Sequence, residues 1–157
     1  MARPVCLSLS LAPRRSGRVL ASKAMIRIRH STTPYVELEI EGSNSEWAEL
    51  RAAVLDFSKA GEPVLDLPAD SEFDPSPYQH KLARLRLHKT SGPILISVAG
   101  NALSISGKPE LLSLFAENMP YDAQHTSGVG YHVHFDRLGR EDHVSEASLG
   151  VVLGLRK

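Results

Sequence analysis

The chain has 157 residues, 42% hydrophobic and 23% charged, and this balance is typical of a single globular domain. No apolar run approaches the roughly 18 residues of a membrane-spanning helix, so we expect no membrane partner. Cys6 is the single cysteine, which excludes an internal disulfide and a cysteine-based zinc site and is typical of a reducing compartment.

The formal net charge is zero, but the charges are distributed unevenly along the chain. All 18 Asp and Glu lie at or beyond Glu37, whereas five of the 18 Lys and Arg precede Met25. From Met25 onward, 13 basic residues therefore stand against 18 acidic ones, a net charge of −5. Because an acidic domain repels phosphate groups, we expect no nucleic-acid partner.

Residues 1–24 contain no acidic residue and are rich in Arg, Ser and Ala. This composition fits a targeting segment such as a transit peptide, and it equally fits a disordered or mis-assigned extension ahead of a true start at Met25. A secretory signal fits less well, because the apolar run VCLSLSLA is short and a pair of arginines follows it. The pattern of a strand begins directly after Met25, so we assign the folded domain to residues 25–157.

Two strands are predicted at the start of this domain, at 26–30 and 35–41, where apolar and polar side chains alternate. If they pair antiparallel, Arg27 and Arg29 lie opposite two glutamates, which explains the acidic stripe of the second strand without any partner. The alternative is an acidic surface presented to a basic partner. The inward positions are Ile26, Ile28, His30, Val36, Leu38 and Ile40, and the acidic stripe is Glu37, Glu39 and Glu41.

A helix is predicted next, beginning at Ser43. Ser43 and Glu46 have the spacing of a capping box. Gly61 is placed to end the helix in a left-handed conformation, and Pro63 prevents its continuation. The apolar stripe that should pack on the sheet contains Trp47, Leu50, Val54 and Phe57, with Ala53 beside them.

Residues 63–80 carry four prolines and four acids, and beyond a short strand at 64–67 they have the composition of a long exposed loop. The carboxylates lack the spacing of an EF-hand, so we interpret them as solvated or as part of an acidic partner surface. Within the run 81–89, apolar and basic side chains alternate from Ala83 to His88, which predicts a strand with a basic outer face at a sheet edge.

A hairpin, a helix and a histidine-bearing strand are predicted between Ile94 and Asp136. Gly100-Asn101 is a favoured two-residue hairpin turn, and Pro109 suits the first turn of a helix that Pro120 stops. The sequence YHVHFD follows as a short strand, and SLGVVLGL as an apolar strand of the kind found at the centre of a sheet. Together the elements predict one α+β domain, with a mainly antiparallel sheet of about five to seven strands and two principal helices on one face.

His132, His134 and Asp136 share one face of their predicted strand, because alternate residues of a strand point the same way. Two imidazoles and a carboxylate are a plausible partial ligand set for zinc or iron, with His125 or His143 as a further ligand. Strand histidines are more often structural, and no nucleophile motif such as GxSxG is present. A small metal-binding protein or metal-dependent enzyme is thus an alternative, and we otherwise expect no cofactor.

The run ILISVAGNALSISGKPELLSLFAENM, followed by GYHVHFD and an apolar strand, resembles the Imm32-type immunity proteins of bacterial polymorphic toxin systems. The resemblance covers most of residues 25–155 and singles out His132 and His134. It implies a cytoplasmic protein, not an enzyme, that binds and neutralises a cognate protein toxin. A stand-alone interaction domain without a toxin partner is a third interpretation. Our candidate partner contacts are Glu37, Glu39, Glu41, Asp70, Glu72 and Asp74.

Overall fold

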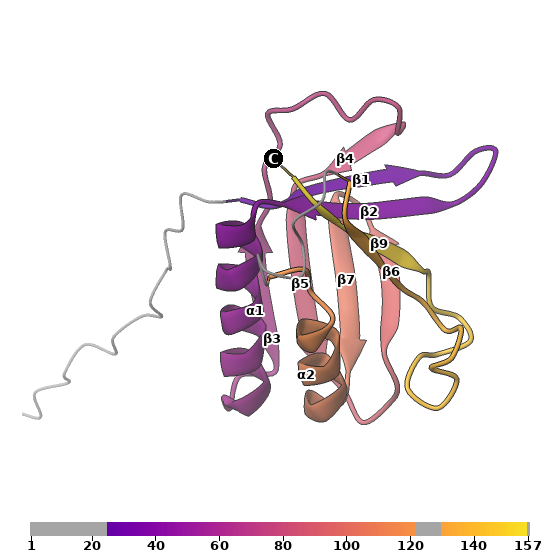
Figure 1. Ribbon diagram of the computed structural model, residues 1–157. Helices are drawn as coiled ribbons and strands as arrows, with labels where there is room; N and C mark the ends of the chain where they lie inside the picture. The colour runs from indigo at the N-terminus through magenta and orange to yellow at the C-terminus, as the bar shows by residue number, and fades with distance from the viewer. Residues whose placement is uncertain (1–24, 122–129, 157) are drawn as a thin grey trace, which may run out of the picture.

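The structure is a computed structural model that describes residues 25–121 and 130–156 (Figure 1). Within these residues the chain forms two helices and nine strands, and the strands make one mixed sheet of five and another of four. The α+β prediction is confirmed, although the strands divide between two sheets where one was expected. Residues 1–24, which we assigned to a segment outside the domain, lie outside the described residues.

The five-stranded sheet contains the predicted N-terminal hairpin and has the order β4-β1-β2-β9-β8. The antiparallel register places Arg27 opposite Glu41 and Arg29 opposite Glu39, as predicted. The apolar strand β9 lies between β2 and β8, parallel to β2, so its central position is also confirmed. The strands are β1 (Arg27–Ser31), β2 (Glu37–Gly42), β4 (His80–Leu82), β8 (His132–Phe135) and β9 (Val151–Leu155).

The four-stranded sheet has the order β3-β5-β7-β6, with β5 and β7 parallel. Gly100 has a φ of 60°, which the two-residue turn between β6 and β7 requires. The predicted strand at 81–89 breaks at Ala83, where the chain passes from one sheet to the other. Its second part, β5, lies between β3 and β7, so the predicted edge position is wrong. The strands are β3 (Val64–Pro68), β5 (Arg84–Lys89), β6 (Leu95–Ala99) and β7 (Ala102–Gly107).

The two helices are α1 (Asn44–Lys59) and α2 (Pro109–Glu117), which pack against each other and lie beside the four-stranded sheet (Figure 1). The predicted capping box is present, because the Ser43 Oγ accepts from the Glu46 N–H and the Glu46 carboxylate accepts from the Ser43 N–H. The prediction that Gly61 ends this helix in a left-handed conformation is wrong. Instead, Ala60, which has an extended backbone, donates its N–H to the carbonyls of Asp56 and Phe57. This gives two carbonyls of the last turn a hydrogen-bond donor.

The core lies where both helices and both sheets contribute side chains. Trp47 of α1 is fully buried, and its indole N–H donates to the Gly154 carbonyl of β9 at 2.9 Å. Phe115 of α2 and Phe135 of β8 pack edge to face, with ring centroids 5.0 Å apart. Val36, which alternation assigned to this core, is instead 55% exposed, because β2 begins only at Glu37 and the hairpin extends beyond the sheet.

His30 of β1 is buried on the inner face of the five-stranded sheet, 8% exposed, with its ring centroid 6.2 Å from that of His80. Burial, and then the nearby positive charge of His80, lower the pKa of His30. The folded pKa therefore lies below the unfolded value of about 6.5. The unfolded state then takes up the proton more readily, so the stability from His30 is present above that pH and is lost as the pH falls.

We therefore expect the free energy of unfolding, measured with urea, to fall between pH 7.5 and pH 5.5, and to fall less in a His30→Phe variant. A His143→Gln variant is the control for removing a histidine that is exposed and lies elsewhere in the chain. Equal pH dependence in the His30→Phe variant and the parent chain would show that His30 is not the titrating group.

Candidate functional site

Most of the residues singled out in the sequence meet on the face of the five-stranded sheet that points away from the core. Alternate residues of β1, β2, β9 and β8 share this face, because successive side chains of a strand point to opposite sides. The register aligns Glu39, Val152 and His134 in one row across the sheet, and Glu41, Gly154 and His132 in the next. We call this surface the outer face; its residues are Arg27, Arg29, Glu37, Glu39, Glu41, Val152, Gly154, His132 and His134.

Arg29 neutralises the middle of the acidic stripe. Its guanidinium lies 3.1 Å from the Glu39 carboxylate and 3.2 Å from that of Glu41. All three side chains are less than a fifth exposed, so solvent screens these ion pairs only in part. The predicted cross-strand pairing is therefore confirmed for Arg29. Arg27 instead binds Asp70 at 3.0 Å, and Glu37 is exposed at the end of the stripe.

The other three predicted contacts, Asp70, Glu72 and Asp74, lie in the proline-rich loop after β3. Phe73 anchors this loop, because it is buried and packs against the guanidinium groups of Arg27 and Arg29, 5.1 and 5.6 Å from the ring centroid. Arg27 and Arg29 thus lie beside both the acidic stripe of β2 and the acidic residues of this loop. The side chains of Glu72 and Asp74 remain exposed, whereas that of Asp70 is held in its ion pair.

The pKa directions in this loop follow from local hydrogen bonds. Burial raises the pKa of Asp70, but the Glu72 N–H and Arg27 outweigh it, so the pKa is lowered overall. The Ser76 N–H donates to Asp74 at 2.9 Å and lowers the pKa of that carboxyl as well. Both groups therefore carry a negative charge near neutral pH, and the loop presents fixed acidic groups next to the outer face.

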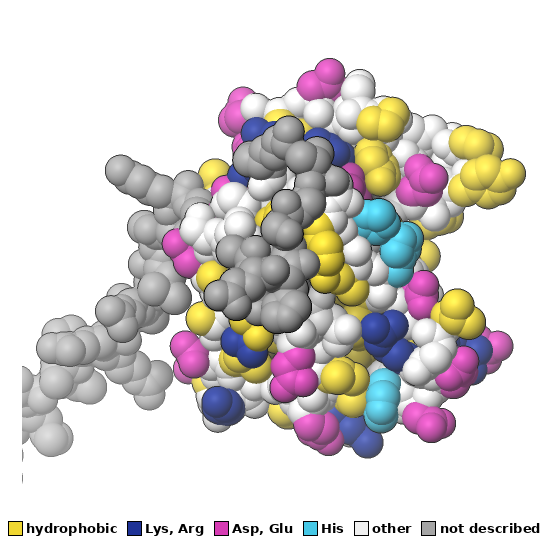
Figure 2. All heavy atoms as spheres, viewed as in Figure 1, with side chains coloured by type: hydrophobic (Ala, Val, Ile, Leu, Met, Phe, Trp, Pro, Cys, Tyr) yellow, Lys and Arg dark blue, Asp and Glu magenta, His cyan; other side chains and the backbone are white. Residues whose placement is uncertain are grey.

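His132 and His134 lie at the opposite edge of the outer face, on β8, with ring centroids 5.1 Å apart. Figure 2 shows histidine side chains exposed on this part of the surface. The Gly130 carbonyl lies 2.8 Å from the His132 Nδ1, and because a carbonyl can only accept, Nδ1 carries the proton of this hydrogen bond. A depression of about 300 Å³ separates the histidines from the two paired glutamates.

Gly154 keeps this depression open. A Cβ at this position would lie 3.3 Å from the Glu39 carboxylate, closer than most side chains tolerate. The carboxylate therefore lies against the backbone of β9, and the floor between Glu39 and the histidines stays free of side-chain atoms at that point. Acidic and imidazole groups thus line a shallow concave surface in which a basic side chain of a partner has both charge and hydrogen-bond acceptors available.

The alternative metal site is not assembled among the described residues. Asp136 follows β8 and uses its carboxylate to accept the Leu138 N–H at 2.9 Å. His143 lies exposed in a different connection, and His125 falls outside the described residues. Across residues 25–121 and 130–156, no three side chains of His, Cys, Asp or Glu come together in a way that could hold a metal ion.

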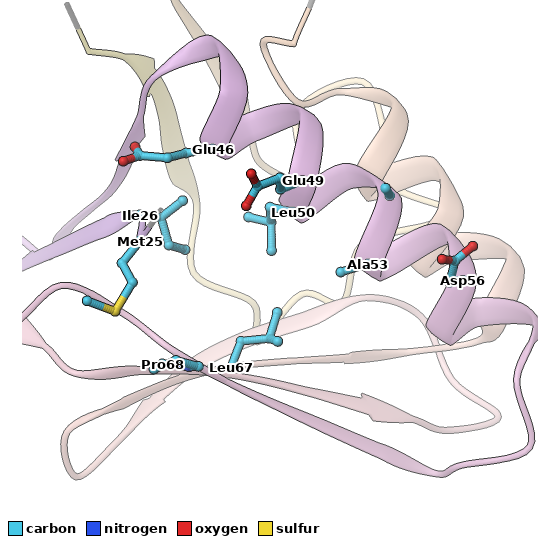
Figure 3. A pocket seen from close by; sticks show the side chains of 10 residues that line it. Met25, Ile26, Glu46, Glu49, Leu50, Ala53, Asp56, Leu67 and Pro68 are labelled. Carbon is cyan, nitrogen blue, oxygen red and sulfur yellow. The ribbon is translucent and has the colours of Figure 1, made fainter. Parts of the chain in front are cut away.

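A second concave surface lies between α1 and β3 and was not predicted from the sequence (Figure 3). It has a volume of about 340 Å³ and a mainly apolar lining. Its rim carries three carboxylates of α1, and one of them, Glu46, is bound by Arg156 at 2.5 Å. The lining residues are Met25, Ile26, Leu50, Ala52, Ala53, Leu67 and Pro68, with Glu46, Glu49 and Asp56 at the rim.

Comparison with protein-family models, with curated proteins and with solved structures found no match to this chain. Within the part of the chain that the structure describes, neither helix has both the length and the apolar character needed to cross a lipid bilayer.

Proposed function

We propose that this chain is an immunity protein that binds and neutralises a cognate bacterial protein toxin, and that the outer face makes the contact. One observation carries the proposal: the acidic stripe of β2 and the two histidines of β8, singled out separately in the sequence, lie on the same accessible sheet face. The resemblance to immunity proteins of polymorphic toxin systems supports the same role.

The electrostatics of the domain suit a basic partner. Residues from Met25 onward carry a net charge of −5, and this field favours encounter with a cationic toxin surface over a range of about 10 Å at 0.1 M salt. The exposed carboxylates of Glu37, Glu72 and Asp74 are available to a partner, while the ion pairs of Arg29 fix the charges behind them. Because the side chains of Arg29, Glu39 and Glu41 are already held in place, they lose little conformational entropy on binding.

The test is co-expression with the toxin encoded by the gene next to that of this chain. We expect growth to be restored, and the purified proteins to form a one-to-one complex whose association slows as the salt concentration rises. A Glu37→Lys variant should associate about tenfold more slowly, because it reverses an exposed charge on the approach path. Asp142→Lys is the matched control, since Asp142 is also exposed but lies outside the outer face.

Absence of both a complex and growth protection with the parent chain would reject the proposed function. A complex in which both charge reversals slow association equally would instead show that net charge steers the encounter without any special part for the outer face.

A further inference from the structure

The end of the β1–β2 hairpin carries an exposed pair of large apolar side chains. Tyr35 is 75% exposed and Val36 55% exposed. They belong to residues 32–36, which we call the hairpin tip, and in Figure 1 this tip projects beyond the rest of the five-stranded sheet. Two neighbouring apolar side chains on a projecting turn can enter a partner's surface without any rearrangement of the core.

The hairpin tip is held in place by one side chain of the proline-rich loop. The Gln79 Oε1 accepts the backbone N–H groups of Thr32 at 2.9 Å and of Thr33 at 3.3 Å. Its Nε2 donates to the Thr33 carbonyl at 3.0 Å and to the Thr33 hydroxyl at 2.5 Å. The Gln79 N–H in turn donates to the Ser31 hydroxyl at 3.1 Å. Gln79 therefore holds the first part of the hairpin tip, at Thr32 and Thr33.

An exposed acidic side chain lies at the base of the hairpin tip. Glu37 follows Val36 directly, and its carboxylate is exposed. Tyr78, next to Gln79, lies close to the carboxylates of Glu37 and Glu39. Burial raises the pKa of Tyr78, and the charges of Glu39 and Glu37 raise it further. The apolar pair is thus bordered by the exposed Glu37 carboxylate, and the complementary surface is an apolar socket with a basic residue at its rim.

We propose that the hairpin tip is the anchor of the complex: Tyr35 and Val36 enter an apolar socket of the toxin, and Glu37 pairs with a Lys or Arg at its rim. This inference rests on the proposed function and specifies its central contact. Tyrosine is a frequent hot-spot residue, because it buries a large area at the cost of few rotatable bonds. Gln79 acts as a positioning residue, because fixing the turn beforehand lowers the entropy lost on binding.

The experiment measures binding of the purified chain to a catalytically inactive form of the toxin from the neighbouring gene. Tyr35→Ala should raise the Kd by about 30-fold or more, the scale of a hot-spot residue. Leu138→Ala is the matched control, because Leu138 is 83% exposed on a different connection and should leave the Kd unchanged. Both sites are exposed, so neither variant should lower the unfolding temperature.

Gln79 is tested by two variants and a second readout. Gln79→Ala should raise the Kd by several-fold and speed amide hydrogen exchange at Thr32 and Thr33, whose N–H groups lose their acceptor. Gln79→Glu keeps the acceptor oxygen and should restore part of the exchange protection. If Gln79 only stabilised the rest of the loop, its replacement would not speed hydrogen exchange at these two amides selectively.

The outcomes separate the two proposals. If the parent chain binds the toxin and Tyr35→Ala binds equally well, the anchor is overturned while the proposed function stands. If Leu138→Ala weakens binding as much as Tyr35→Ala, the loss is unspecific and the anchor is again overturned. If the parent chain neither binds nor protects, the proposed function fails and the anchor fails with it.

Discussion

Replacing Trp47 by Ala is expected to lower the free energy of unfolding by about 3–5 kcal/mol, the scale for truncating a buried tryptophan. Trp47 is fully buried, and its indole joins α1 to β9 through the hydrogen bond to the Gly154 carbonyl. The substitution leaves a cavity at the junction of the helix and the five-stranded sheet. Since a domain of this kind is stable by about 5–15 kcal/mol in total, the variant should lie near the limit of folding.

The measurement is urea denaturation followed by far-ultraviolet circular dichroism, because Trp47 is the single tryptophan and its removal abolishes the tryptophan fluorescence signal. Trp47→Phe is the control. It keeps most of the apolar volume and loses the indole N–H, so we expect a smaller loss, about 1–3 kcal/mol. A loss below about 1 kcal/mol for Trp47→Ala would contradict the central packing role assigned to this residue.

The second large effect is expected at Arg29, because its removal leaves two carboxylates of the same strand face without their shared cation. Arg29→Met should lower the free energy of unfolding at pH 7 by about 2–3 kcal/mol, less than for a fully buried pair because these side chains are slightly exposed. The Arg29 Nε is buried without a hydrogen-bond partner among the described residues, and relief of that cost offsets part of the loss.

Arg84→Met is the matched control for Arg29. Arg84 binds Asp66 at 2.9 Å on the other sheet, but its side chain is 49% exposed, so its loss should cost less than about 1 kcal/mol. Adding Glu39→Gln and Glu41→Gln to Arg29→Met should recover stability, because the repulsion between the two carboxylates disappears. Chemical denaturation of the four proteins tests this, and no recovery in the triple variant would show that Arg29 stabilises the sheet by packing alone.

Local signals in the sequence were enough to predict the elements whose structure depends on neighbouring residues. The capping box at Ser43 and the glycine turn at Gly100 are set within a few residues, and both are present. The break at Ala83 was not predicted: two consecutive apolar residues, Leu82 and Ala83, interrupt the alternation there, but they do not show that the chain changes sheets. Backbone hydrogen bonds of Ala83 with Ala69 and Asn101, both distant in sequence, hold the chain where it passes from one sheet to the other.

The candidate site was predictable in its parts but not as a whole. Alternation placed Glu37, Glu39 and Glu41 on one face of their strand, and His132 and His134 on one face of theirs. Their meeting on one face depends on β9 pairing with both β2 and β8, and no local pattern encodes that choice of neighbours. The exposure of Val36 was missed for a related reason, because alternation does not reveal where a sheet ends.

The parallel pairing of β2 with β9 has a consequence for how the protein is made. Trp47 and its hydrogen-bond partner Gly154 are 107 residues apart, so at about 5–20 residues per second the ribosome needs roughly 5–20 s to supply the second after the first. During that interval β2 has an unpaired edge, and α1 lacks part of the surface on which it packs. The nascent chain must therefore remain unassembled at this sheet until β9 emerges, and a chain interrupted before β9 exposes an open strand edge to chaperones and proteases.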